Sequence, residues 1–350
     1  MASENVAVEN GTPPILSVRN LKTYFFSEEG TVKAVDGASF DVKPGETLGI
    51  VGESGCGKSV TARSILQIVE RPGRVVDGKI LWRREQKDGR DGLVDLARLE
   101  SNGQEIRRIR GAEIALIFQE PMTSFSPVHT VGDQIGEVLL LHRDISRHEA
   151  RDRVIELLRR VGIPRPEQRV DAYPYQFSGG LRQRAMIAMA LACDPRLLIA
   201  DEPTTALDVT TQAQILDLLR DLQQQNHMAI MLITHNLGVV AEMADDVVVM
   251  YLGRVVEKGP VDAIFHEAKH PYTQALLRSI PSLDAPAREK LPTISGSIPH
   301  PSNRPMGCPF HPRCPSYMRG VCDKAEPELH MVGEKHEVSC FLYQRSEGAT

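Results

Sequence analysis

The stretch TLGIVGESGCGKSV, residues 47–60, decides the fold of this chain. It starts as a short apolar run, passes through a glycine-rich turn, and leads into a helical pattern from Lys58 to Val69. Gly52–Ser59 fits G-x-x-x-x-G-K-[ST] between a strand and a helix, the context in which this motif binds phosphate. The glycines let backbone N–H groups surround phosphates, Lys58 brings positive charge, Ser59 offers a hydroxyl to Mg²⁺, and the helix N-terminus adds its dipole. An ordinary glycine turn is the alternative, but the context favours a nucleotide site lined by Gly52, Ser54, Gly55, Cys56, Gly57, Lys58, Ser59 and Val60.

A second signal is the apolar run Leu197–Ala200, which ends in Asp201, Glu202 and Pro203. An apolar strand that ends in aspartate would place a carboxylate beside the phosphates, where it can hold Mg²⁺ and its waters. The adjacent Glu202 could orient or deprotonate an attacking water. A strand followed by an exposed acidic turn is the alternative, which the phosphate motif in the same chain disfavours.

Apolar runs and helical patterns alternate along the middle of the chain. Short buried strands are predicted at Ile114–Phe118, Leu197–Ala200 and Ala229–Thr234, as in parallel sheets. A helical pattern covers Val131–Val161. Strands that alternate with helices predict an α/β fold with a parallel sheet. The charged, glycine-bearing residues Arg83–Gly92 are predicted to form a surface loop.

Length and composition limit the class of protein. The chain has 350 residues, which at roughly 150 residues each suggests about two domains. With 41% hydrophobic and 25% charged residues, it is neither mostly disordered nor collagen-like. Its net charge of −5 lacks the basic footprint of a dedicated nucleic-acid binder, so no nucleic-acid partner is predicted. The chain shows no secretory signal and no apolar run of ~20 residues, so we expect a cytosolic protein that meets a membrane only through a partner.

The two ends of the chain differ in composition from its middle. Residues 1–14 are small and polar, with proline and glycine among them, which predicts a flexible tail. Nine of the 35 residues from Pro281 to Pro315 are proline, a density that disfavours long helices and central strands. We therefore expect a separate, loop-rich extension at the C-terminus.

Four of the six cysteines gather in this C-terminal region, at Cys308, Cys314, Cys322 and Cys340. Because structural disulfides are disfavoured in a cytosolic protein, four clustered thiolates suggest a metal. Structural zinc usually uses closely spaced cysteine pairs, which this pattern lacks, whereas four thiolates also suit an iron–sulfur cluster. A cluster, zinc and no metal all stay open on the residues alone. Cys56 and Cys193 are predicted to pack or to line the phosphate loop, and His311 to be a loop histidine.

The segment FSGGL, residues 177–181, is followed by RQR and a helical pattern about 20 residues before Asp201. Here the sequence resembles the ATP-binding subunit of an ABC transporter, whose signature is an SGG turn at a helix N-terminus. A plain linker fits less well, because a helix rich in Ala, Met, Ile and Leu follows directly. The resemblance implies that Ser178, Gly179 and Gly180 complete the nucleotide site of a second ATPase subunit.

The other elements of that family follow in its order. By resemblance, Gln119 lies in the loop that links nucleotide to a membrane partner, and His235 is the switch histidine that touches the γ-phosphate. The segment from Thr205 to Asp208 is similar to the family's dimer-contacting loop. The resemblance implies catalysis by Glu202, His235 and Gln119, and Mg²⁺ held by Ser59, Gln119 and Asp201.

Phe25 stands where the family places an aromatic ring against adenine. Tyr24 and Phe26 are its neighbours, and simple core packing is the alternative for all three. This is the least specific of the implied contacts.

The resemblance covers roughly Ile15 to Cys340 and implies the fold class: α/β, a P-loop NTPase of the ABC type. The implied parts are a RecA-like core, an antiparallel β subdomain, a helical subdomain and a loop-rich, metal-binding C-terminal extension. Their expected bounds are a tail at 1–14, the nucleotide-binding domain at 15–265 with its helical subdomain at about 120–185, and the extension at 266–350.

Four segments resemble the ATPases of dipeptide and oligopeptide permeases in particular: QEPMTS (119–124), YPYQFS (173–178), RQR (182–184) and HPYTQALL (270–277). That branch also imports nickel chelates, opines and some oligosaccharides. Some members hold a [4Fe–4S] cluster in a C-terminal tail similar to residues 308–315. Leu181 departs from the family's usual glutamine, which implies that the two sites of a dimer are unequal.

The resemblance implies an ATPase, with ATP, Mg²⁺ and a [4Fe–4S] cluster as cofactors, that energises import of peptides or related solutes. Its expected partners are a homologous but different ATPase chain, two transmembrane permease subunits and an extracytoplasmic solute-binding protein. It would lie peripherally on the cytoplasmic face of the inner membrane. Two other classes compete. A soluble, non-transport ABC ATPase commonly carries two cassettes where this chain has one, and an iron–sulfur sensing protein would not need Glu202 and His235.

Overall fold

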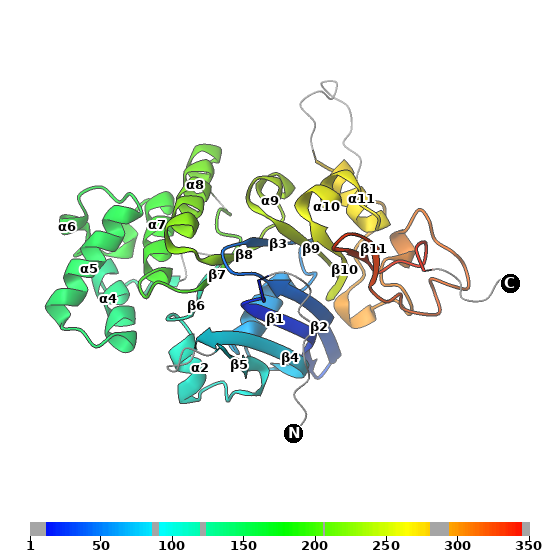
Figure 1. Ribbon diagram of the computed structural model, residues 1–350, viewed down its shortest axis with the longest axis horizontal. Helices are drawn as coiled ribbons and strands as arrows, with labels where there is room; N and C mark the ends of the chain where they lie inside the picture. The colour runs from blue at the N-terminus through cyan, green and yellow to red at the C-terminus, as the bar shows by residue number, and fades with distance from the viewer. Residues whose placement is uncertain (1–11, 86–90, 120–123, 206, 281–293, 345–350) are drawn as a thin grey trace.

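The computed structural model describes residues 12–85, 91–119, 124–205, 207–280 and 294–344. Two sheets stand at its centre, a lobe of helices lies at one end, and the C-terminal extension lies at the other (Figure 1). Most of the tail predicted at 1–14, residues 120–123 of the QEPMTS segment, and residues 281–293 of the proline-rich region lie outside the described residues.

The larger sheet runs in the order β11-β12-β10-β9-β3-β8-β7-β6, and the strands from β9 to β6 pair in parallel. Every residue of β3, β7 and β8 is buried, as expected for strands covered on both faces. Because β3, β7 and β8 are parallel, their C-terminal ends meet at one edge of the sheet. The strands are β3 (Thr47–Val51), β6 (Ile114–Ile117), β7 (Leu197–Asp201), β8 (Ala229–Ile233), β9 (Asp246–Tyr251), β10 (Arg254–Pro260), β11 (His330–Gly333) and β12 (His336–Val338).

The second sheet is antiparallel, in the order β2-β1-β4-β5. The loop predicted at Arg83–Gly92 is wrong at both ends, because Arg83 pairs with Leu93 and Arg84 with Gly92. An antiparallel edge tolerates charge on its wet face, and the Arg84 guanidinium lies 2.5 Å from a carboxylate oxygen of Glu113. The tip, residues 86–90, lies outside the described residues. The strands are β1 (Leu16–Ser27), β2 (Gly30–Val42), β4 (Gly73–Glu85) and β5 (Asp91–Asp95).

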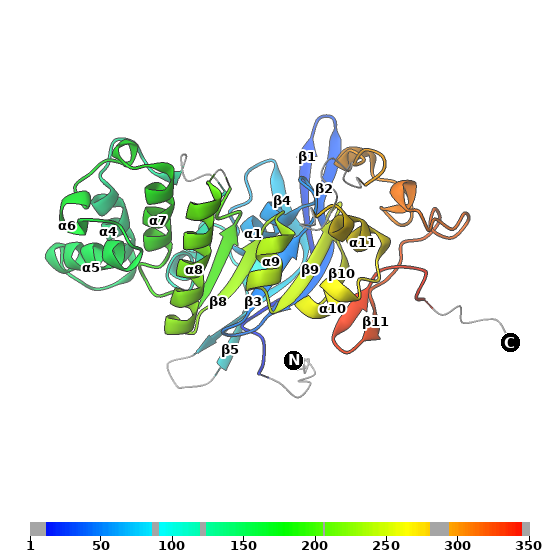
Figure 2. The same cartoon turned by 90° about the horizontal axis from the view of Figure 1, so that it is seen from above.

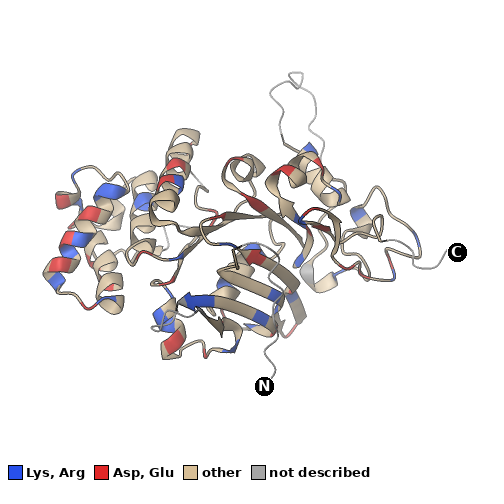
Figure 3. Ribbon diagram, in the orientation of Figure 1, with Lys and Arg blue, Asp and Glu red and all other residues tan. Residues whose placement is uncertain are grey.

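The helical lobe splits the single helical pattern predicted over Val131–Val161 into two helices. Ser146 starts the second one, because its hydroxyl accepts a hydrogen bond from the Glu149 N–H at 3.2 Å, as a helix N-cap does. Acidic and basic residues alternate along this second helix (Figure 3). The lobe contains α4 (Val131–His142), α5 (Arg147–Arg160), α6 (Pro166–Arg169) and α7 (Gly179–Ala190).

The remaining helices cover the sheets. The helix that follows the phosphate loop ends at Ile65, four residues before the predicted end, and Gln67 then takes a left-handed conformation with φ 54°. None of the helices within the described ranges is long and apolar enough to cross a membrane. These helices are α1 (Lys58–Ile65), α2 (Gln104–Ile109), α8 (Val209–Asn226), α9 (Leu237–Met243), α10 (Val261–His266) and α11 (Pro271–Arg278).

The C-terminal extension packs onto the nucleotide-binding core. Its strand β12 pairs with β10, with Val338 opposite Glu257, and β11 pairs with β12. Phe310 lies in one hydrophobic cluster with Tyr251 and Tyr272. The extension therefore shares both a sheet and a core with the chain that precedes it.

Candidate functional site

The phosphate loop starts where β3 ends. Gly52 has φ 149°, and a Cβ there would lie 2.2 Å from the Met250 carbonyl oxygen, so only glycine fits. Gly57 takes a left-handed conformation with φ 102° immediately before α1. Lys58 is 6% exposed, and its Nζ donates to the carbonyl oxygens of Gly52 at 2.8 Å and Glu53 at 3.2 Å. The loop thus closes around a buried ammonium group.

The other loop residues differ in exposure. Ser54 and Gly55 are exposed at the tip, and Val60 is half-buried in α1. Cys56 is 4% exposed, and its Sγ lies 3.8 Å from the Nζ of Lys58. Burial raises the pKa of the Cys56 thiol despite the nearby lysine charge. Cys56 is therefore a neutral packing group beneath the loop.

Ser59 and Asp201 meet between α1 and the end of β7. The Ser59 hydroxyl donates to Oδ1 of Asp201 at 3.0 Å, and Asp201 is 4% exposed. Burial and the adjacent Glu202 charge raise the pKa of Asp201, against the lowering effect of the Ser59 hydrogen bond. A bound cation would reverse that shift. A hydroxyl and a carboxylate placed together in this way are hard oxygen donors of the type that Mg²⁺ takes.

Glu202 joins three other side chains. Its Oε1 lies 3.2 Å from Nδ1 of His235, and its Oε2 accepts hydrogen bonds from Gln119 Nε2 at 3.1 Å and Thr205 Oγ1 at 2.8 Å. Burial raises the pKa of Glu202, but the hydrogen bonds from Thr205 and His235, with nearby positive charge, outweigh it and leave the pKa below its ordinary value. Glu202 is therefore ionised at neutral pH and able to accept a proton.

The parallel sheet brings these groups together. Gln119 follows β6, Glu202 follows β7, His235 follows β8 and Lys58 follows β3, so all four lie beyond the C-terminal ends of neighbouring strands. This edge is where α/β sheets bind their ligands. The contacts described above join Ser59 to Asp201, and they join Gln119 and His235 to Glu202. The hydrogen bonds described for Lys58 stay within its own loop.

The three neighbouring aromatic side chains of β1 have different surroundings. Phe25 lies against Gly73, where an added Cβ would be 2.6 Å from its ring. The Tyr24 hydroxyl donates to Asp36 at 2.6 Å. The guanidinium carbon of Arg74 lies over the Phe26 ring, 4.6 Å from its centroid. Among the interactions described, none joins these three rings to Lys58 or Glu202.

The SGG segment lies apart from the phosphate loop. Ser178 caps α7, where its hydroxyl accepts from the Leu181 N–H at 3.4 Å. A Cβ on Gly180 would lie 2.8 Å from the Thr211 side chain, and Asp208 caps α8 through the Thr211 N–H at 3.0 Å. Figure 2 shows α7 on the far side of α8 from α1. Ser178, Gly179, Gly180 and Asp208 therefore form a second group, distinct from the one around Lys58.

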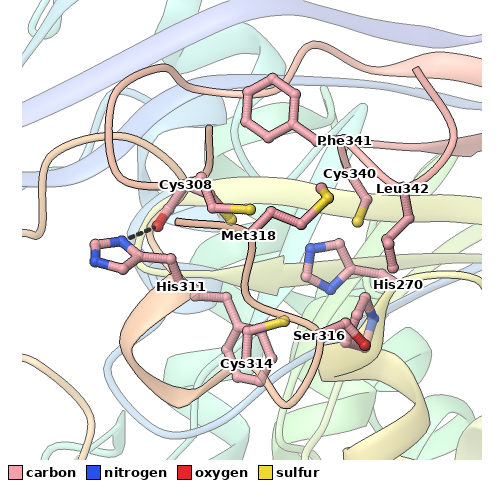
Figure 4. A pocket seen from close by; sticks show the side chains of 12 residues that line it. His270, Cys308, His311, Cys314, Ser316, Met318, Cys340, Phe341 and Leu342 are labelled. Carbon is pink, nitrogen blue, oxygen red and sulfur yellow. Dashed lines mark hydrogen bonds between the residues drawn. The ribbon is translucent and has the colours of Figure 1, made fainter. Parts of the chain in front are cut away.

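The four C-terminal cysteines converge on one small cavity. Its lining includes His270, Met318, Cys308, Cys314, Cys322 and Cys340. Figure 4 shows Cys308, Cys314 and Cys340 arranged around the same space, and all four thiols are free. Burial raises the pKa of Cys308 to about 11, with nearby cysteines adding to it, and burial likewise raises that of Cys340 to about 11.

The side chains that line this cavity suit an iron–sulfur cluster, but the cavity is small for one. Four thiols are the ligands that such a cluster uses. The cavity has a volume of about 10 Å³, which is room for about one water molecule. Within the described ranges, no three His, Cys, Asp or Glu side chains are placed to hold a metal ion. Cluster binding would require the loops that carry the cysteines to move apart.

Sequence reasoning missed an ion pair at the phosphate loop. Arg313, in the C-terminal extension, lies 2.8 Å from a carboxylate oxygen of Glu53. The phosphate motif accepts any residue type at position 53, and 260 residues separate the two partners. Nothing in the sequence pattern connects them.

Comparison with known proteins extends over nearly the whole chain. Residues 35–205 match the family described as ABC transporter, and residues 256–322 match the family described as Oligopeptide/dipeptide transporter, C-terminal region. The chain is 51% identical over 336 residues to an oligopeptide transport ATP-binding protein of Bacillus subtilis, covering 96% of this chain and 98% of that protein. It is 50% identical over 337 residues to a dipeptide transport ATP-binding protein of the same organism, covering 96% and 97%.

Solved structures show the same arrangement of the core. A dimeric ATP-binding cassette in a post-hydrolysis state, bound to ADP and Pi, superposes with a TM-score of 0.60 at 25% identity, covering 70% of this chain and 98% of that chain. A component of an ABC transporter complex from Clostridium perfringens superposes with a TM-score of 0.58 at 28% identity, covering 73% and 91%.

Proposed function

The chain belongs to the ABC transporter family, and on this premise we propose that it is the ATP-hydrolysing subunit of an importer for peptides. Two relatives of nearly the same extent are named for oligopeptide and dipeptide transport, and residues 256–322 match the C-terminal region of such transporters. An importer of oligosaccharides, opines or nickel chelates is the alternative for the cargo, and a soluble, non-transport ATPase is the alternative for the role.

One observation supports hydrolysis above all. The ionised Glu202, which follows Asp201 directly in sequence, is hydrogen-bonded to Gln119 and His235. In the proposed mechanism Lys58, Ser59 and the loop amides bind phosphates. Glu202 takes a proton from the attacking water, and His235 steadies the γ-phosphate. Ser59, Asp201 and Gln119 would hold Mg²⁺, which supplies charge neutralisation. The remaining nucleotide contacts are proposed for Phe25, Gly52, Ser54, Gly55, Cys56, Gly57 and Val60.

A second ATPase subunit completes each site in this proposal. Ser178, Gly179, Gly180 and Asp208 would face the nucleotide of the partner, which is a homologous but different chain. The separation of α7 from α1 (Figure 2) supports this arrangement, because the SGG turn is not beside this chain's own phosphate loop. Two permease subunits, a peripheral position at the cytoplasmic face of the inner membrane, and an extracytoplasmic binding protein complete the transporter.

Assembly with the permease and partner ATPase tests the role of the chain. Full-length protein should co-fractionate with membranes and hydrolyse ATP faster in the complex than alone. The cargo is tested by mass spectrometry of ligands released from the cognate binding protein. Peptides are expected. Sugars or metal chelates would reassign the cargo, and a chain found only away from membranes would reject the transport role.

Leu181→Gln is expected to raise turnover at the site that uses the partner's phosphate loop. The Leu181 side chain packs partly against the lobe core and offers no polar group to a facing nucleotide. One added hydrogen bond should increase turnover about two- to tenfold. The measurement uses the assembled complex with Lys58→Ala in this chain, so that the remaining turnover comes from the other site. Leu181→Met is the control of similar size without a donor, and equal rates for both variants would end the idea of unequal sites.

We propose further that Cys308, Cys314, Cys322 and Cys340 hold a [4Fe–4S] cluster. The support is their convergence on one cavity from positions spread along the extension. The four deprotonated thiols would act as ligands, and the group would cross-link the loops that carry them. The expected role is structural or redox-sensing, because ATP hydrolysis needs no electron.

Anaerobically purified protein should be brown, with broad absorption near ~400 nm and about four irons per chain. Cys314→Ser should bleach it and expose the extension to protease, while ATP binding persists. Cys193→Ser, in the buried cysteine of the lobe, is the control and should keep the colour. Colourless protein with stoichiometric zinc, or with no metal and an already protected extension, would count against the cluster.

A further inference from the structure

The C-terminal extension reaches the phosphate loop through a buried arginine. The side chain of Arg313 is 4% exposed. Its two terminal nitrogens donate to the two carboxylate oxygens of Glu53, at 2.8 and 3.1 Å. Its Nε donates to the Ser295 carbonyl oxygen at 3.1 Å, and Nη1 donates to the Tyr251 hydroxyl at 3.3 Å. A forked arginine–carboxylate pair of this kind fixes orientation as well as distance.

Glu53 is held at three points, and one of them is the phosphate-binding lysine. Its carboxylate is held by Arg313, and its backbone N–H donates to the Tyr272 hydroxyl at 2.8 Å. Its carbonyl oxygen accepts from Nζ of Lys58 at 3.2 Å. Glu53 is thus the junction through which the extension contacts Lys58.

Aromatic packing supports the same junction. Phe310, three residues before Arg313, has its ring centroid 5.4 Å from that of Tyr272 and 5.3 Å from that of Tyr251. The two tyrosine rings are 4.7 Å apart. The extension therefore contacts Glu53 in two ways. Arg313 binds its carboxylate, and Phe310 packs against Tyr272, whose hydroxyl accepts from the Glu53 backbone N–H.

A second arginine of the extension approaches the loop from the side of β2. Arg304, 12% exposed, donates to Asp36 at 2.7 Å, and Asp36 also accepts from the Tyr24 hydroxyl. The Asp36 N–H donates to the Gly253 carbonyl oxygen at 2.8 Å. The Gly253 N–H in turn donates to the Cys56 carbonyl oxygen at 2.9 Å. Two independent sets of bonds thus connect the extension with the phosphate loop.

We propose, on the basis of the nucleotide site proposed above, that Arg313 is a positioning residue of that site and acts through Glu53. A phosphate loop binds its ligand with backbone N–H groups, so its affinity depends on how firmly the loop conformation is held. Arg313 holds it from outside the motif, which makes the extension a component of the nucleotide site. Removing this contact should weaken Mg-ATP binding and raise KM, whereas kcat at saturating ATP should change little because Glu202 is untouched.

The test is Mg-ATP affinity of the full chain, measured by titration calorimetry. Arg313→Met should weaken binding about tenfold, the effect of losing hydrogen bonds to a charged group. Arg313→Lys should fall between wild type and Arg313→Met, because lysine keeps the charge but loses the fork. Glu53→Gln should resemble Arg313→Met. The double variant should bind no more weakly than the worse single variant, because both changes remove one shared contact.

The double variant also controls for misfolding caused by an unpaired buried charge. A single substitution leaves a buried charge without its partner, whereas Arg313→Met with Glu53→Gln leaves none. Arg319→Met is the matched control, because Arg319 is an exposed arginine in the same extension, and it should bind Mg-ATP within about twofold of wild type. Circular dichroism and thermal melting report folding for each variant.

Lys58→Ala separates the two levels of the proposal. If it loses Mg-ATP while Arg313→Met and the folded double variant bind like wild type, the role of Arg313 is rejected and the nucleotide site stands. If Lys58→Ala itself binds like wild type, the proposed site is rejected. A loss in Arg319→Met equal to that in Arg313→Met would show general damage to the extension and would also reject positioning through Glu53.

Discussion

Glu202→Gln is expected to lower ATP turnover by about 10²–10⁴, the range for losing a general base, while ATP still binds. Glutamine keeps the shape of the side chain and can still contact Thr205 and His235, but it cannot take a proton from water. The wild-type carboxylate can, because its lowered pKa keeps it ionised at neutral pH. With hydrolysis blocked, the variant should accumulate as a closed, ATP-loaded dimer. Steady-state phosphate release and size-exclusion chromatography with ATP measure both effects.

Glu156→Gln is the matched control for this experiment. Glu156 lies on α5 of the helical lobe with 57% of its side chain exposed, whereas Asp201 ends β7 of the larger sheet (Figure 1). Its loss should therefore not change turnover. Phosphate release at the wild-type rate in Glu202→Gln would remove Glu202 from the mechanism. Loss of ATP binding in that variant would show instead that the carboxylate is needed to hold the nucleotide.

Lys58→Ala should reduce Mg-ATP affinity by about a hundredfold or more, because the charge-assisted contacts of the ammonium group with phosphate are lost. Transport should stop with it. Lys58 is buried and also donates to the carbonyl oxygens of Gly52 and Glu53, so some loss of thermal stability is expected as well. Titration calorimetry measures the affinity, and a melting curve of the same sample separates weak binding from unfolding.

Lys22→Ala controls for the removal of a half-buried lysine outside the phosphate loop. Lys22 pairs with Asp77 at 2.9 Å, and an exposed pair of this kind contributes at most about 1 kcal/mol. Mg-ATP affinity should therefore match wild type in this variant. Wild-type affinity in Lys58→Ala would mean that residues 52–59 do not form a phosphate site.

Most of the candidate site could be predicted from sequence because each of its groups belongs to a short local pattern. Lys58 follows an apolar strand and a glycine turn, and Asp201 ends an apolar strand. Parallel strands of one sheet end at a common edge, so patterns far apart in the chain come together once the sheet forms. The hydrogen bond from Ser59 to Asp201, across 142 residues, is the outcome.

Local pattern failed where neighbouring strands or helix caps decide the structure. The charged residues Arg83 and Arg84 have the composition of a loop, but β5 offers their backbone a pairing partner and Glu113 offers Arg84 an ion pair. The helical pattern over Val131–Val161 continues through Ser146, whose hydroxyl starts a new helix. Composition averages over such single contacts and so cannot report them.

The sequence by itself determined where a glycine-rich turn precedes a helix, where a buried strand ends in a carboxylate, and which apolar runs form buried strands, because these features depend on residue type at short spacing. Only the tertiary structure decided what surrounds them. The pairing of Arg313 with Glu53 and of β12 with β10 joins segments far apart in the chain, and so does the meeting of four cysteines at one cavity. Such contacts depend on the packing of the whole chain, in which the burial of Phe310 against Tyr251 and Tyr272 brings the extension to the phosphate loop.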